Sequence, residues 1–298
     1  MKLLVTGANG HSGKQFLTIL NEKNGKKFEE IHAVSRSSHL DEAQYPNLNI
    51  KQHHGDLKDK EFVGQIMEDI DVVLHIAGIQ MSENVIHAAI EHDVDWVIAV
   101  HTTGRYSKFK SASAEYVRIE DELLTLRDKI NITVLRPTMI YGSSEDRNMY
   151  RLIKFVNKFP FYPIFGNGNN LMQPVAASDL AKAYDQVIEH SEVTKNQNYN
   201  LSGKYPIKYK DLVKAVAYYS GKRIRLIKVP VSLSYQLVEL MNKVYSKFPI
   251  NSEQVLRMRE DKDFTHLNAS KDFGYNPLSF NEGIEKEVQE FKSKSNEA

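Results

Sequence analysis

Residues 2–14, KLLVTGANGHSGK, decide the fold. An apolar run typical of a strand, residues 3–5, leads directly into three glycines, and apolar residues then return at helical spacing. A strand, a glycine turn and a helix in this order form the layout of a dinucleotide pyrophosphate site, because the helix N-terminus then faces the negative charge. Gly7 permits the tight turn, Gly10 lets the backbone approach the phosphates, and Gly13 lets the helix pack closely on the sheet. We therefore expect cofactor contacts from Gly7, Asn9, Gly10, His11, Ser12 and Gly13.

The composition is that of an ordinary soluble globular protein of 298 residues, long enough for a large core. The formal charge of +1 gives no global field that points to nucleic acid or to an anionic membrane. The chain has no cysteine, which excludes disulfides and thiolate metal sites, and no histidine or carboxylate cluster has metal-ligand spacing. No apolar stretch is long enough for a membrane span. We expect a cytoplasmic protein with a small-molecule substrate and no metal, and a homodimer is compatible with these features.

The first half of the chain alternates strand and helix patterns. Strands are predicted at residues 3–5, 31–35, 50–53, 72–76, 96–101 and 132–135. Helices are predicted between them at residues 13–20, 60–70, 84–92 and 112–126. This alternation is typical of an α/β protein with a Rossmann-type doubly wound parallel sheet covered on both faces.

The second half is less regular. Helices are predicted at residues 150–158 and 179–190, a loop at 160–168, and short strands at 198–201 and 225–229. We expect a dinucleotide-binding domain of residues 1–140, to which 175–202 return, and a smaller helix-rich substrate lobe of residues 141–174 and 203–298. Residues 231–244 have an apolar face that is interpreted as a core-facing helix of this lobe rather than a membrane-surface or partner helix, since their polar face lacks a basic cluster.

Polar residues that follow the predicted strands suit the adenosine half of a dinucleotide. Arg36 follows the second strand, where a guanidinium pairs with a 2′-phosphate and favours NADP, while an acidic residue would favour NAD; Ser35 adds a hydroxyl. Asp56 follows the third strand and either accepts a hydrogen bond from the adenine amino group, beside Leu57, or caps the next helix. The small residues after the fourth strand, Ile76, Ala77 and Gly78, let the cofactor pass over the sheet edge.

These motifs, together with others farther along the chain, carry a family resemblance. They are Thr6-Gly-x-x-Gly-x-x-Gly13, Gly55-Asp-Leu57, His75-Ile-Ala-Gly78, Leu135-Arg-Pro137 with Tyr141-Gly142, Gln173-Pro-Val175 with Asp179-Leu-Ala181, and the closing segment 267–284. In this order they resemble the extended short-chain dehydrogenase/reductase superfamily, and more narrowly the NAD-dependent epimerase/dehydratase family. The resemblance covers nearly the whole chain and implies the fold, whereas the reaction type stays open because the family includes epimerases, dehydratases, reductases and inactive relatives.

The resemblance implies a tyrosine acid/base, a lysine four residues later that lowers the tyrosine pKa and holds the nicotinamide ribose, and a hydroxyl after the fifth strand. Tyr106 and Lys110 form the Tyr-x-x-x-Lys of this region, and Thr103 matches the hydroxyl. The resemblance also implies that the nicotinamide half of the cofactor is lined by Thr102, Pro137, Thr138 and Met139.

The catalytic match departs from the family pattern. The dyad of relatives lies on the helix before the Arg-Pro strand, and Lys110 is far from Arg136. On the predicted helix, Tyr116 is followed at four residues by Glu120, which cannot supply the charge of a lysine. Two alternatives stay open: the site has shifted to Tyr106 and Lys110, or the dyad is degenerate.

The resulting expectation is an oxidoreductase or epimerase that uses NADP, with NAD as the other option, and acts on a nucleotide-sugar or a similar hydroxyl or carbonyl metabolite by reversible hydride transfer. One alternative is a catalytically degenerate NADP-binding sensor or scaffold. A second is an NADPH-dependent ketone or aldehyde reductase with an apolar pocket, for which Phe161, Tyr162 and Phe165 are candidates.

Overall fold

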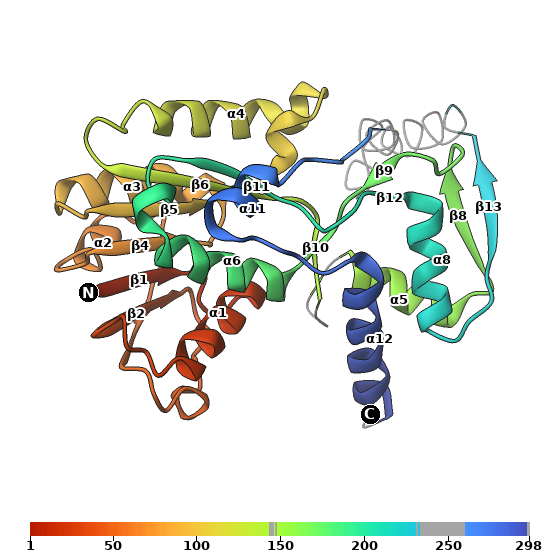
Figure 1. The fold of residues 1–298 in the computed structure, drawn as a ribbon, viewed down its shortest axis with the longest axis horizontal. Coiled ribbons are helices and arrows are strands. Elements are labelled where there is room, and N and C mark those ends of the chain that lie inside the picture. The colour runs from red at the N-terminus through yellow and green to blue at the C-terminus, as the bar shows by residue number, and fades with distance from the viewer. Residues whose placement is uncertain (143–145, 147, 231, 233–259, 297–298) are drawn as a thin grey trace.

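The structure is a computed structural model that describes residues 1–142, 146, 148–230, 232 and 260–296. Figure 1 shows a central sheet with its helices on the left and a smaller lobe on the right. The sheet has seven parallel strands in the order β11-β6-β5-β4-β1-β2-β3. The strands are β1 (Lys2–Thr6), β2 (Glu30–Ser35), β3 (Ile50–His54), β4 (Val72–His75), β5 (Trp96–Val100), β6 (Asn131–Pro137) and β11 (Asn198–Leu201). The predicted α/β doubly wound sheet is confirmed, including the return of residues 198–201 to its edge.

Helices cover both faces of the sheet. One core contains side chains of α1 (His11–Glu22), α6 (Ala177–Glu189) and α11 (Leu267–Phe273), and a short helix α7 (Ser191–Thr194) follows α6. The opposite core contains side chains of α2 (Lys60–Gln65), α3 (Ser82–Glu91) and α4 (Lys110–Leu124). The central strands β4 and β5 are buried along their whole length, as parallel strands covered on both faces must be.

The lobe has a third core of its own, built mainly from α5 (Met149–Lys158), α8 (Tyr209–Tyr219) and α12 (Phe280–Asn296). Three two-stranded sheets accompany these helices. They pair β7 (Ile140–Tyr141) with β10 (Val175–Ala176), β9 (Leu171–Met172) with β12 (Ile207–Lys208), and β8 (Phe161–Phe165) with β13 (Arg225–Val229). The division into residue ranges stays a prediction, but Ala269, Phe273 and Tyr275, expected in the lobe, belong to the core beside α1 and α6.

Two local predictions need correction. The loop predicted at residues 160–168 contains β8, because β13 pairs with it in parallel from more than sixty residues away in the sequence. The helix predicted at residues 60–70 ends at Gln65. The helix predicted at residues 231–244 lies outside the described residues, apart from residue 232.

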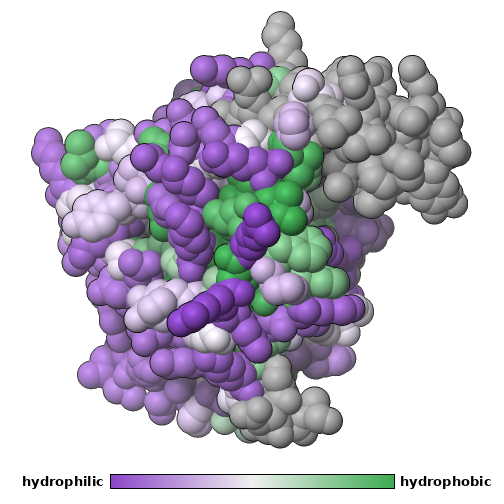
Figure 2. Space-filling view, turned by 90° about the vertical axis from the view of Figure 1, so that its right-hand side faces the viewer, coloured by the Kyte–Doolittle hydropathy of each residue, from purple (hydrophilic) through white to green (hydrophobic). Residues whose placement is uncertain are grey.

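The outer face of the lobe is mostly hydrophilic with an apolar area near its middle (Figure 2). Phe159, Phe161 and Ile227 are large apolar side chains of the lobe that are exposed. Two of them lie on the β8–β13 pair. In the described part of the chain, no helix has the length and apolar character needed to cross a membrane.

Candidate functional site: a dinucleotide cavity and a polar cavity beside it

The glycine loop between β1 and α1 has the geometry that a phosphate-binding turn requires. Gly7 has a positive φ of 72°, which favours glycine. A Cβ on Gly13 would lie 2.5 Å from the Gly7 carbonyl oxygen, and one on Gly10 would lie 3.0 Å from the same atom. Helix α1 begins after Gly10 without a side-chain cap, so the N–H groups of its first turn point into the loop region where an anion would be stabilised.

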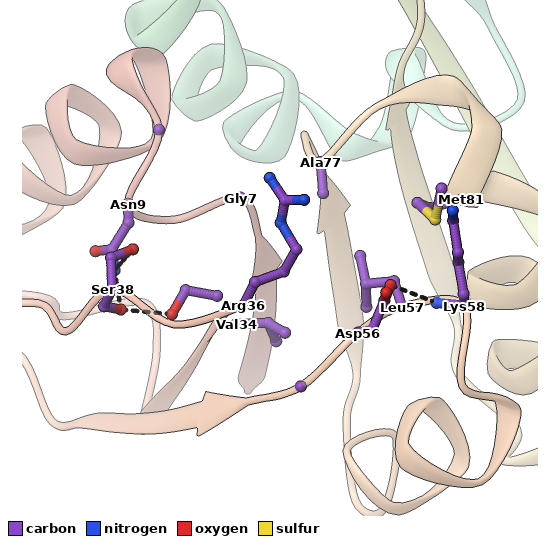
Figure 3. A pocket seen from close by; sticks show the side chains of 13 residues that line it. Gly7, Asn9, Val34, Arg36, Ser38, Asp56, Leu57, Lys58, Ala77 and Met81 are labelled. Carbon is purple, nitrogen blue, oxygen red and sulfur yellow. Dashed lines mark hydrogen bonds between the residues drawn. The ribbon is translucent and has the colours of Figure 1, made fainter. Parts of the chain in front are cut away.

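A cavity of about 470 Å³ opens beside this loop, at the carboxyl ends of β1 to β4. Eight expected cofactor residues line it, namely Gly7, Asn9, Gly10, Ser35, Arg36, Asp56, Leu57 and Ala77. Figure 3 shows the Arg36 guanidinium pointing across the cavity toward Gly7 and Ala77, with Asp56 and Leu57 on one side and Asn9 on the other. Asn9 donates hydrogen bonds to the Ser38 carbonyl oxygen (2.5 Å) and hydroxyl (2.8 Å). These bonds hold together the side of the cavity that lies on the left in Figure 3. The residues present therefore fit the adenosine and pyrophosphate part of a dinucleotide.

The carboxylate at the end of β3 remains available to a ligand. Asp56 accepts only a local backbone hydrogen bond, from the Lys58 N–H at 3.0 Å, among the side-chain bonds of the described residues. The N-cap of α2 is Asp59, which accepts from the N–H groups of Glu61 and Phe62. The alternative in which Asp56 caps that helix is therefore wrong.

A buried hydrogen-bond network holds the turn after β4 against the end of β1. Burial lowers the pKa of His75 to about 3, so its imidazole is neutral. Its Nε2–H donates to the Gly78 carbonyl oxygen at 3.1 Å, which leaves Nδ1 to accept from the Thr6 hydroxyl at 2.7 Å. The Thr6 oxygen in turn accepts from the N–H groups of Ile76 and Ala77. Thr6 and His75, the first residues of two of the family motifs, thus position the expected residues of this turn.

Other expected cofactor residues do not line the large cavity. Gly13 packs beneath Gly7, and Ser12 is buried and accepts a hydrogen bond from the Tyr184 hydroxyl. His11 lies close to Gly142, since a Cβ on that glycine would stand 3.6 Å from the His11 Nε2. The Pro137 carbonyl oxygen accepts a hydrogen bond from the Thr103 hydroxyl at 3.2 Å.

A second cavity, of about 250 Å³, lies at the ends of β5 and β6 and is called the Thr102 cavity here. It is lined by three residues expected to contact the nicotinamide half, Thr102, Thr138 and Met139. Two residues of the expected catalytic set, Thr103 and Tyr106, line it as well. Segment 260–264 closes one side: Glu260 accepts from the Ser107 hydroxyl (2.9 Å) and the Lys108 N–H (2.6 Å). Lys108 and Lys262 also line this cavity, although no motif indicates them.

The structure does not place Tyr106 and Lys110 on one helix. Tyr106 ends a 3₁₀ turn, Thr103–Tyr106, and the backbone is extended at Ser107 and Phe109 before α4 begins at Lys110. The facing of side chains four residues apart in a helix therefore does not apply to this pair. The Lys110 side chain lies outside the described part of the chain.

The Tyr106 hydroxyl faces an arginine instead. It accepts a hydrogen bond from Arg136 Nη1 at 3.0 Å and donates to Asn200 Oδ1 at 3.3 Å. Its ring packs against Phe264, with centroids 5.4 Å apart. Tyr106 thus stands between the Thr102 cavity and the edge of the sheet.

On α4, the residue four positions after Tyr116 is Glu120, whose carboxylate is buried. Glu120 accepts hydrogen bonds from Arg136 Nε (2.8 Å) and Nη2 (2.5 Å), from Arg105, and from His101 Nδ1 (2.9 Å). Burial alone would raise the pKa of Glu120, but the hydrogen bonds from His101 and Arg136 lower it to about 2. Tyr116 packs against the core on this side of the sheet. The usual helix of the dyad therefore carries an ion cluster in this chain.

The apolar residues predicted for a reductase pocket lie away from the two cavities. Phe161, Tyr162 and Phe165 lie on β8 and line none of the cavities described above. In the residues that the structure describes, no group of three or more histidines and carboxylates is arranged to hold a metal ion.

Comparison with known proteins agrees with this architecture. Residues 7–160 match a protein family described as NAD(P)H-binding. Short-chain dehydrogenase/reductase family 42E member 1 of Mus musculus is 22% identical to this chain, over 98% of this chain and 87% of that protein. The low-salt glycan biosynthesis protein Agl12 of Haloferax volcanii is 21% identical over 65% of this chain and 74% of its own length.

Two solved structures show the same fold. UDP-glucose 4-epimerase from Thermotoga maritima, solved with UDP-glucose, superposes with a TM-score of 0.75 at 18% identity and covers 99% of this chain and 100% of its own. The dTDP-glucose 4,6-dehydratase DesIV from Streptomyces venezuelae, solved with NAD, gives a TM-score of 0.75 at 16% identity, covering 99% and 98%.

The fold and the cofactor cavity define a dinucleotide-binding protein of the Rossmann class. The chain belongs to the NAD(P)H-binding family, and its relatives lie in the extended short-chain dehydrogenase/reductase and epimerase/dehydratase superfamily, so the predicted resemblance is confirmed.

Proposed function

We propose that this protein is an NADP(H)-dependent oxidoreductase that acts on a hydroxyl or carbonyl group of a small metabolite. The observation that carries the proposal is the position of Arg36, which follows β2 and extends into the dinucleotide cavity. A guanidinium at this place pairs with a 2′-phosphate, whereas the ribose diol of NAD is usually bound by a carboxylate. Bound NADP(H) would supply or accept the hydride.

The residues of the Thr102 cavity are the proposed substrate-facing groups. Thr103 and Tyr106 line it at the ends of β5 and the following turn, where the nicotinamide half is expected. We assign proton transfer to the Tyr106 hydroxyl, which Arg136 and Asn200 hold in place, and orientation of the substrate oxygen to the hydroxyl of Thr103. Lys110 stays a predicted third member. Nucleotide-sugars are the first substrate class to test, since the two similar enzymes are named for UDP-glucose and dTDP-glucose.

Substitution of the proton donor tests the reaction. Turnover should be screened with NADPH and NADP⁺ against nucleotide-sugars and simple carbonyls. Tyr106→Phe keeps the ring that packs on Phe264 but removes the proton, so it should lower turnover by about 10²–10⁴ and leave NADPH affinity nearly unchanged. Tyr116→Phe is the matched control and should be almost silent. Loss of turnover in Tyr116→Phe with Tyr106→Phe unaffected would overturn the assignment.

A second candidate function is a cofactor-binding sensor or scaffold without catalysis. The Glu120 cluster favours it, because the helix that normally carries the dyad presents a carboxylate already bound to two arginines. Tight NADPH binding without turnover on any compound of the panel supports this second function.

A further inference from the structure

A third cavity, which we call the Arg136 cavity, shares Tyr106 with the Thr102 cavity and has a volume of about 190 Å³. It opens between the edge strand β11, the end of β6 and the start of α11. Its polar lining includes Tyr106, Arg136, Asn198, Asn200, His266 and Asn268. Among the described residues that line it, there is no carboxylate. It is distinct from the dinucleotide cavity, with which it shares no lining residue.

Next to this cavity, two positively charged arginines share one buried carboxylate. Glu120, whose side chain is fully buried, is shared by Arg105 and Arg136. The other acidic partner of Arg105 is Asp121, whose side chain is 56% exposed and which, among the ion pairs of the described residues, does not pair with Arg136. Arg136, with 9% of its side chain exposed, therefore has only a share in one buried carboxylate.

A neighbouring arginine adds to this excess of positive charge. Within the described residues, the hydrogen bonds of Arg127 go to neutral oxygens, namely the carbonyls of Ile132 and Gln197 and the side-chain amide of Asn198. Burial lowers the pKa of Arg127, and the charge of Arg136 lowers it further. An anion placed in the Arg136 cavity would reduce this repulsion.

We propose that the Arg136 cavity binds a small oxyanion, the carboxylate or phosphate group of a metabolite. A planar guanidinium matches either group through paired N–H donors, and burial strengthens the attraction. The amides of Asn198, Asn200 and Asn268 provide further polar contacts without competing charge. A cavity of this volume admits inorganic phosphate or malonate but not a dinucleotide. Since Tyr106 lines both cavities, the bound group lies one side chain away from the Thr102 cavity.

Titration calorimetry with sodium phosphate and with sodium malonate, at an ionic strength held constant with NaCl, tests this site. Asn268 is exposed at the rim, so Asn268→Asp places a repelling charge there without a change of size, and it should weaken binding about tenfold. Asn276→Asp, also exposed but not lining the cavity, is the matched control and should bind as the wild type does. Saturable binding of either probe with this difference supports the proposal and identifies the group; no saturable binding, or equal weakening in both variants, overturns it.

Two further variants make the test independent of the cofactor cavity and of turnover. Asn200→Asp supplies the missing carboxylate beside Arg136, so it should raise the melting temperature and remove the response to both probes. Arg36→Ala should leave phosphate binding unchanged. If phosphate binding is lost in Arg36→Ala and retained in Asn268→Asp, the ion belongs to the dinucleotide cavity and the proposal is wrong.

Discussion

At the scale of single residues, Glu120 shows how one side chain separates this protein from the pattern it resembles. The sequence indicates that a lysine is missing four residues after Tyr116, but it cannot reveal what the glutamate does. Its partners are His101, which directly follows β5, Arg105 in the next turn and Arg136 on β6, and only folding brings them together. Likewise, Tyr106 and Lys110 match a helical spacing, yet the helix begins only at Lys110.

Replacement of Glu120 should destabilise the fold. Glu120→Gln leaves the buried Arg136 without its charge partner and removes one of the two acidic partners of Arg105. Removal of one member of a buried ion pair costs about 3–5 kcal/mol. Because the pKa of Glu120 is lowered in the folded state, its stabilisation is present above the ordinary value of 4.5 and is lost as pH falls toward 2. Urea unfolding should therefore show a large deficit at pH 7 that narrows below pH 4.5. Glu122→Gln, on the same helix with a half-exposed side chain, is the control; an equal effect of both variants would contradict the account.

At the scale of elements, the sequence predicts those whose pattern is local. Apart from the helix predicted at residues 60–70, which ends at Gln65, the strands and helices of the first 135 residues lie close to their predicted positions, because each combines a buried face with glycine or polar boundaries. Strand β8 is not predictable in this way: Pro160 and Pro163 indicate a loop, and the hydrogen bonds that make it a strand come from β13.

Helix α12 contains a buried carboxyl that should make stability depend on pH. Burial, and then the nearby Asp146, raise the pKa of Glu287 to about 8, so the folded protein holds a proton that the unfolded chain releases near 4.5. Stability contributed by this proton is complete below 4.5 and is lost as pH rises through 8, at ~1.4 kcal/mol per unit of pKa difference. Glu287→Gln should melt at a higher temperature than the wild type at pH 9 and show a smaller difference at pH 5. Glu285→Gln, exposed on the same helix, should not; identical pH profiles for both variants would refute this role.

At the scale of the whole molecule, the alternation of strand and helix patterns predicts the sheet and its two covered faces, and the glycine pattern predicts where the cofactor cavity lies. The segment 260–264, which joins the lobe to the turn after β5, has no comparable sequence signal. Thr6 and His75 stand in two of the family motifs, but those motifs do not reveal that the two side chains hold the turn after β4. Their roles depend on contacts between segments 69 to about 150 residues apart, so only the folded chain shows them.

The proposed function requires that the fold present a cavity for NADP(H), with Arg36 as the group that selects the 2′-phosphate. Titration of the wild type and of Arg36→Ala with NADPH and NADH tests it most directly, with Arg223→Ala, an exposed arginine of the lobe, as the control. A charge-assisted pair contributes roughly 1.5–3 kcal/mol, so the wild type should bind NADPH about ten- to a hundredfold more tightly than NADH. Arg36→Ala should lose that preference and keep its affinity for NADH. Equal affinity of the wild type for both dinucleotides, or binding of neither, would contradict the account.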